Sequence, residues 1–148
     1  MNDPVVLWRL RRFLLATAAL LFVGAVIELW LVDHNETVVQ LIPFALCGLG
    51  FIAVVAVLFR PRRTTMLALR ACLCLVLLGS LFGVYEHVVG NIAFQKEIHP
   101  NATTREVFMG AIGGANPLLA PGVLALAAAL AMAATYYHPA LEKNLQKP

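Results

Sequence analysis

The side chains that could do chemistry in this chain gather near one end of its long apolar segments. Six of the eight carboxylates and three of the four histidines lie there. Glu28 and the neighbours Glu86 and His87 fall inside apolar segments, about one helical turn from where these segments end. Ionisable groups at that depth in a membrane are costly, and they usually face the interior of a helix bundle or a wet cavity. We therefore expect Glu28 and Glu86 to face the protein interior.

Amide side chains from other segments are expected at the same depth, so that all these groups together form a polar pocket. Hydrogen bonds from such a pocket, with Trp30 and Tyr85 as aromatic walls, suit a quinone or a lipid head group. The candidate ligand-binding residues are Glu28, Gln40, Glu86, His87, Asn91 and Asn116.

A divalent metal ion is a second candidate ligand for this region, because imidazole and carboxylate groups bind zinc, manganese and iron. The candidate metal ligands are His87, Glu86, Glu28, His34 and His99. None of these residues forms an HxxxH or HxxE pair, the spacings that place two ligands on one face of a helix. The sequence therefore implies no particular cofactor.

Two further interpretations apply to the same residues. Glutamate and histidine can relay protons, but the opposite halves of the apolar segments offer few polar groups beyond Thr17, Ser80 and Thr135. The residues can also form a purely structural cluster, in which each hydrogen bond between membrane helices contributes about 0.6 to 2 kcal/mol. No nucleophile–base pair or phosphate-binding loop occurs in the sequence, so we do not expect an enzyme.

Four apolar segments must position these side chains. The chain is 61% hydrophobic and 13% charged, whereas about 25% of the residues in a soluble domain are charged. Each segment is long enough to cross the hydrocarbon core of a bilayer, where backbone groups must bond within their own helix. The sequence therefore predicts an all-α integral membrane protein, a four-transmembrane-helix antiparallel bundle in a single domain of residues 1–148. The expected spans are residues 13–32, 37–59, 71–89 and 117–137.

The basic residues predict how the chain lies in the membrane. Nine of the eleven lysine and arginine residues fall on one side of the expected spans, and only Lys96 and Arg105 fall on the other. By the positive-inside rule, both termini face the cytoplasm of a multi-pass protein in the cell inner (plasma) membrane. The net charge of +3 follows from this topology and does not predict nucleic-acid binding. We expect the first segment to be a retained anchor, with a cleaved signal peptide as the alternative.

The connection over residues 90–116 faces outward and is long enough to hold structure of its own. Thr103 and Glu106 have the spacing of a capping box and precede apolar residues. This pattern predicts a short extra helix in the loop between the third and fourth spans.

Prolines mark the expected start of the last span. Asn116 and Pro117 are expected to be the N-cap and the first residue of that helix. Pro121 lies one turn further on and is expected to bend the helix near its start. One long kinked helix over residues 104–137 is the alternative.

Gly79 and Gly83 form a GxxxG pattern, which lets helix backbones approach closely. We expect this contact within one chain rather than between two copies. The expected partners are the lipid bilayer and either other membrane subunits or a second copy of the chain. The leading hypothesis is a protein that acts by association, as an accessory or scaffold subunit of a larger membrane assembly. The alternative is a binding or transport protein for a quinone, lipid head group, divalent metal ion or proton at the polar pocket.

Overall fold

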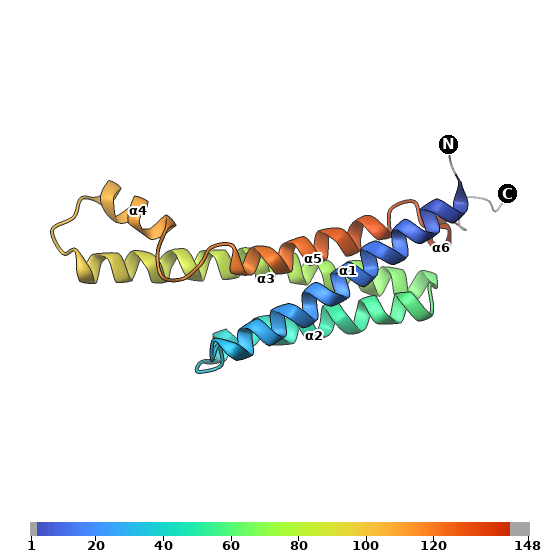
Figure 1. Ribbon diagram of the computed structural model, residues 1–148, viewed down its shortest axis with the longest axis horizontal. Helices are drawn as coiled ribbons and strands as arrows, with labels where there is room; N and C mark the ends of the chain where they lie inside the picture. The colour runs from blue at the N-terminus through green and yellow to red at the C-terminus, as the bar shows by residue number, and fades with distance from the viewer. Residues whose placement is uncertain (1–2, 143–148) are drawn as a thin grey trace.

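A computed structural model describes residues 3–142 as helices joined by short connections (Figure 1). The chain is all-α in this range, as the composition predicts. The six helices found there are α1 (Pro4–Leu31), α2 (Val38–Phe59), α3 (Arg63–Ile98), α4 (Thr104–Ile112), α5 (Ala120–Ala134) and α6 (Pro139–Glu142).

Local capping chemistry sets where the first two helices begin. The side chain of Asp3 accepts a hydrogen bond from the backbone N–H of Val5, and a proline occupies the first turn of α1. This cap starts the helix well before residue 13, where the apolar segment begins, because a helix does not need apolar residues to form its first turns. Thr37 and Gln40 form a capping box at the start of α2.

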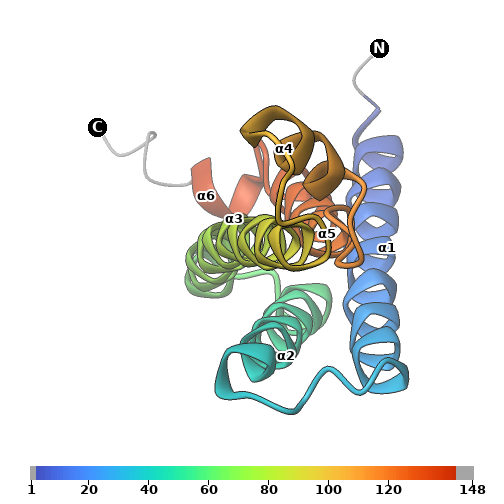
Figure 2. The ribbon, with the colours of Figure 1, turned by 90° about the vertical axis from the view of Figure 1, so that its left-hand side faces the viewer.

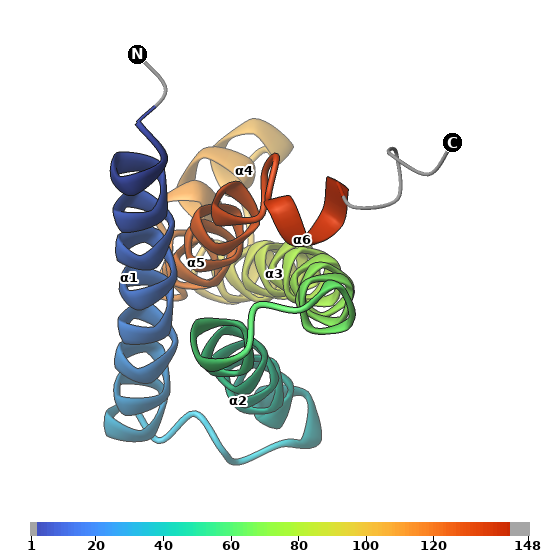
Figure 3. The ribbon, with the colours of Figure 1, turned by 90° about the vertical axis from the view of Figure 1, so that its right-hand side faces the viewer.

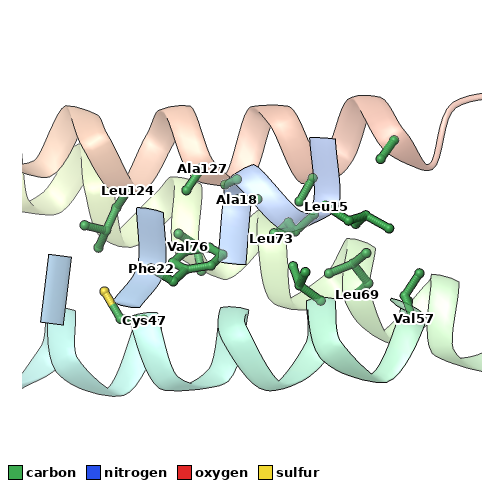
Figure 4. Packing of buried hydrophobic residues seen from close by; sticks show 14 of the residues in the cluster. Leu15, Ala18, Phe22, Cys47, Val57, Leu69, Leu73, Val76, Leu124 and Ala127 are labelled. Carbon is green, nitrogen blue, oxygen red and sulfur yellow. The ribbon is translucent and has the colours of Figure 1, made fainter. Parts of the chain in front are cut away.

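Helices α1, α2, α3 and α5 surround one apolar core. Along the chain they pack as α1 on α2, α2 on α3 and α3 on α5, and α5 closes the ring against α1. Buried side chains from all four helices meet in the centre, among them Phe22, Cys47, Leu73 and Ala127 (Figure 4). Figures 2 and 3, which view the molecule along its length, show α1 and α2 inclined to α3 and α5.

Helix α3 is much longer than the span of residues 71–89 that the sequence predicts. It contains 36 residues, which is about 54 Å at 1.5 Å per residue. The hydrocarbon core of a bilayer is about 30 Å thick, so α3 is far longer than one crossing needs. Its last turns extend beyond the bundle, with α4 folded back against them (Figure 1).

The prediction for the last apolar helix is partly wrong. The short helix α4 begins after the expected cap at Thr103, but α5 begins only at Ala120, with Leu119 as its N-cap. Asn116 and Pro117 lie in an irregular connection. The backbone N–H and carbonyl groups of Asn116 are hydrogen-bonded to the side chain of Asn91 on α3, so they do not start a helix. Pro121 sits in the first turn of α5, where proline is tolerated, rather than bending a helix that has already begun.

Three helices, α1, α2 and α3, are long and apolar enough to cross a membrane. Helix α5 is equally apolar but has only 15 residues. The connection over residues 113–119 separates it from α4, which excludes the single kinked helix over residues 104–137.

We call the end of the bundle that carries α4 and the α1–α2 turn the loop end, and the opposite end the arginine end.

Candidate functional site

A ladder of polar side chains lies on the part of α3 nearest the loop end. His87, Asn91 and Gln95 are spaced four residues apart, so they share one face of the helix. All three contact backbone carbonyl groups in residues 110–117, the segment that ends α4 and leads to α5. The ladder therefore holds that segment on α3.

Asn91 makes the most complete set of bonds in the ladder. Its side chain is fully buried, at 0% exposure. The Nδ2 atom donates to the carbonyl oxygens of Ala111 and Asn116, each at 2.9 Å, and the Oδ1 atom accepts from the Asn116 backbone N–H at 2.9 Å. A buried amide is tolerated only when it is bonded in this way.

His87 and Gln95 complete the ladder on either side of Asn91. The Nδ1 atom of His87 lies 2.8 Å from the carbonyl oxygen of Pro117. A carbonyl oxygen can only accept, so the Nδ1 atom carries the proton in this contact. Gln95 donates through Nε2 to the carbonyl oxygen of Gly110, at a longer 3.5 Å.

Glycines let the segment approach these side chains closely. A Cβ atom on Gly114 would collide with the amide group of Asn91, and one on Gly110 would lie 2.8 Å from the amide carbon of Gln95. Gly113, next in the chain to Gly114, would meet nothing within 4 Å. The close approach therefore depends on the position of each glycine and not on general flexibility of the segment.

A second polar cluster holds the other end of α5. Arg70 on α3 donates to the hydroxyl and carbonyl oxygens of Thr135, at 2.9 and 3.0 Å. Arg11 on α1 donates to the carbonyl oxygens of Tyr136 and Tyr137, at 3.1 and 2.8 Å. Cations at the C-terminal end of a helix also interact favourably with its dipole. These contacts were not predicted from the sequence, although an arginine seven residues into a long helix is a feature that could have indicated them.

The two clusters bond backbone groups just outside both ends of α5, the shortest helix of the bundle. Helix α5 is about 22 Å long at 1.5 Å per residue, less than the thickness of a hydrocarbon core. Unpaired backbone groups are costly in lipid, and the side chains of α1 and α3 satisfy the carbonyl groups that flank α5 on both sides. The polar residues of the ladder thus hold the connection before α5 against α3.

The other candidate ligand-binding residues do not join the ladder. Glu28 is exposed on the surface of α1, which contradicts the expectation that it faces the interior. The last buried residue of α1 is Ala25, so the helix is no longer enclosed where Glu28 lies. Glu86 is half-buried. Gln40 uses its side chain to cap α2. Asn116 is exposed and bonds to Asn91 through its backbone.

The candidate metal ligands are also spread out. Burial lowers the pKa of His34, and the charge of His87 lowers it further, so these two imidazoles lie within electrostatic reach of each other. His99 lies on the exposed tip between α3 and α4. Within residues 3–142, no group of three or more histidine, cysteine, aspartate or glutamate side chains is arranged to hold a metal ion.

Both residues of the GxxxG pattern pack inside the chain. A Cβ atom on Gly79 would collide with Leu46 of α2, and one on Gly83 would lie 3.0 Å from Pro121 of α5. Helix α3 therefore uses its two small residues to bring α2 and α5 close.

A groove of about 670 Å³ lies at the tip of the loop end, between the last turn of α3 and the first turn of α4. Gln95, His99, Asn101 and Glu106 supply its polar groups. The backbone N–H and the hydroxyl of Thr103 donate to Glu106 and hold the pKa of this carboxyl below its ordinary value, with a smaller contribution from His99. The carboxylate is therefore charged at neutral pH.

No family model matches the chain, no curated protein matches its sequence and no solved structure matches its fold. The class that the helices define is an all-α protein with several candidate membrane spans.

Proposed function

We propose that this protein is a multi-pass membrane protein that acts by association, as an accessory or scaffold subunit of a larger membrane assembly. All four helices of the bundle cross the membrane, α5 included. The loop end faces outward and both termini lie in the cytoplasm, at the inner membrane of the cell. The asymmetry of the basic residues supports this orientation.

The observation that carries the proposal is an apolar face on α4. Phe108, Met109 and Ile112 are 53%, 62% and 52% exposed. They share one side of the helix, while Val107 and Ala111 are buried on the other side. Lipid covers the apolar residues of a membrane-spanning helix, so these residues need no protein partner. Helix α4 instead packs on the part of α3 that extends past a single crossing, where its apolar residues are not covered by lipid.

The ladder gives this face a fixed position. Asn91 and Gln95 bond the last residues of α4 to α3, and the capping box at Thr103 fixes its first turn. A rigid apolar face loses little conformational entropy on binding, which favours a protein partner. An exposed contiguous apolar surface outside lipid is typical of an interaction site.

The test is the size of the assembly extracted from native membranes in a mild detergent. We expect the protein to migrate well above its own 16.1 kDa together with a second polypeptide or a second copy. Phe108→Ser should release the monomer. Leu119→Ser is the control, because Leu119 is 83% exposed and lies in the connection rather than on α4. Release by both variants, or by neither, would contradict the proposal.

The groove at the tip favours a second candidate function, the binding of a small ligand. Its volume lies in the range of ligand pockets, and Glu106 and His99 provide a charged and a titratable group. A quinone, lipid head group or divalent metal ion bound there would be recovered from purified protein by mass spectrometry of extracts and by elemental analysis. Glu106→Gln should abolish recovery of the ligand, while an unchanged amount of recovered ligand would exclude this site.

A further inference from the structure

An apolar groove lies between α3 and α5, on the outer surface of the bundle and away from the loop end. Leu77 of α3 and Ala129, Met132, Ala133 and Tyr136 of α5 line it. Its volume is about 500 Å³. The small alanine side chains leave room between the larger ones, and Tyr136 marks its end at the arginine end of the bundle.

The groove ends where basic side chains begin. Arg63, Arg70 and Leu77 follow one another at intervals of seven residues, so they lie on one face of α3. Arg63 is exposed and Arg70 is half-buried. Along this face the surface therefore changes from apolar at Leu77 to basic at the first turns of the helix.

The charge of Arg70 has no anionic partner within residues 3–141. Its acceptors there are the hydroxyl and carbonyl oxygens of Thr135, which are neutral. A guanidinium group has five N–H donors, and these two bonds leave others for an anion. A partly buried cation is stabilised when an anion completes its surroundings.

We propose that the groove and the two arginines bind one anionic phospholipid from the leaflet at the arginine end. An acyl chain lies along Leu77 and the α5 residues, and the phosphate contacts Arg63 and Arg70. The arrangement matches the two parts of such a lipid in order, with apolar contacts at membrane depth and cations at its surface. Basic pockets between membrane helices recognise anionic head groups in this way. The inference does not depend on the function of α4.

The test is native mass spectrometry of the full chain in a neutral detergent, titrated with phosphatidylglycerol or with phosphatidylcholine of the same acyl chains. Phosphatidylglycerol should bind more tightly. Arg63→Gln should weaken its binding by about fivefold, the effect expected of one basic side chain at a membrane surface. Arg9→Gln is the matched control, because Arg9 is an exposed arginine at the same end, on α1.

Ala129→Phe tests the acyl-chain part of the site, because the larger side chain fills the groove. It should weaken the binding of phosphatidylglycerol, whereas Leu126→Phe, at an exposed position of α5 outside the groove, should not. Glycerol phosphate, which has no acyl chain, should fail to displace the lipid.

Three outcomes would overturn the proposal. These are equal affinity for the two lipids, equal weakening by Arg63→Gln and Arg9→Gln, and displacement of the lipid by glycerol phosphate at similar concentrations. The first two would indicate general attraction between the surface and lipid, and the third a site for phosphate alone. The Arg63 pair decides the case even where Ala129→Phe fails to fold.

Discussion

Asn91 shows how one polar residue can hold two elements of this bundle together. Its side chain joins α3 to the end of α4 and to the connection before α5, through three hydrogen bonds to backbone atoms. Asn116, at the other end of two of these bonds, contributes only its backbone. The two asparagines therefore have different roles although both were candidates for the same pocket.

Asn91→Ala should lower the free energy of unfolding by about 2 kcal/mol, because the backbone groups of residues 111 and 116 lose three hydrogen bonds in a buried or part-buried setting. Asn116→Ala should have little effect, since the bonds of Asn116 are made by its backbone. The melting temperatures of both variants in detergent measure the difference. A loss of the same size in Asn116→Ala would contradict the assigned roles.

The two glycines after α4 provide a second matched pair. Gly114→Ala should destabilise the protein and weaken the hydrogen bonds of Asn91, because the new Cβ atom would overlap its amide group. Gly113→Ala should be tolerated, since a Cβ atom there meets nothing within 4 Å. Hydrogen exchange of the Asn116 amide reports the loss directly. Faster exchange in Gly113→Ala than in Gly114→Ala would show that the overlap with the Asn91 amide group does not cause the loss of protection.

At the scale of elements, α4 depends on a charged cap. The carboxylate of Glu106 accepts from the backbone N–H and hydroxyl of Thr103, both at 2.7 Å, and its pKa in the folded protein is lowered from 4.5. A lowered carboxyl pKa means that the stabilisation is complete above pH 4.5 and is lost as the pH falls through the folded value.

Acidification below pH 4.5 should therefore loosen the first turn of α4. Protection factors of the amides of residues 106–108, measured by NMR across this range, should fall with the pH. Glu106→Gln keeps an acceptor that does not titrate, so its protection should be nearly independent of pH. A fall of equal size in Glu106→Gln would assign the pH dependence to another group.

The existence of the bundle helices could be predicted from the sequence, and so could α4, because apolar runs and a capping box are local patterns. The extent of α3 could not. Gly90 and the polar residues after it resemble the end of a helix, but Asn91 and Gln95 gain partners from a segment some twenty residues away. Tertiary contacts of this kind override local preference.

The site was predicted less well than the fold, for the same reason. His87 and Asn91 do lie together, but with the backbone of residues 111–117 rather than with Glu28 and Gln40. At the other end of α5, Arg11 donates to the carbonyl groups of Tyr136 and Tyr137, which lie 125 and 126 positions further along the chain. Backbone carbonyl groups carry no mark in the sequence, so a polar residue can indicate such a contact but its partner is visible only in the structure.

At the scale of the whole molecule, the protein combines three features. Polar contacts hold both ends of α5, the shortest helix of the bundle. The apolar face of α4 lies beyond the bundle at the loop end, and Arg63 and Arg70 lie at the arginine end. This arrangement suits the proposed function, in which the protein binds its partners through exposed surfaces rather than through an enclosed site. We propose that α5 crosses the membrane, so that the α3–α4 tip and the C-terminus lie on opposite sides.

Labelling of single cysteines in intact cells tests this claim most directly. In a chain whose three native cysteines are replaced, Asn101→Cys should react with a maleimide that cannot cross the membrane. Pro148→Cys should react only after the cells are permeabilised. Labelling of Pro148→Cys in intact cells, together with Asn101→Cys, would show that α5 does not cross and would contradict the account.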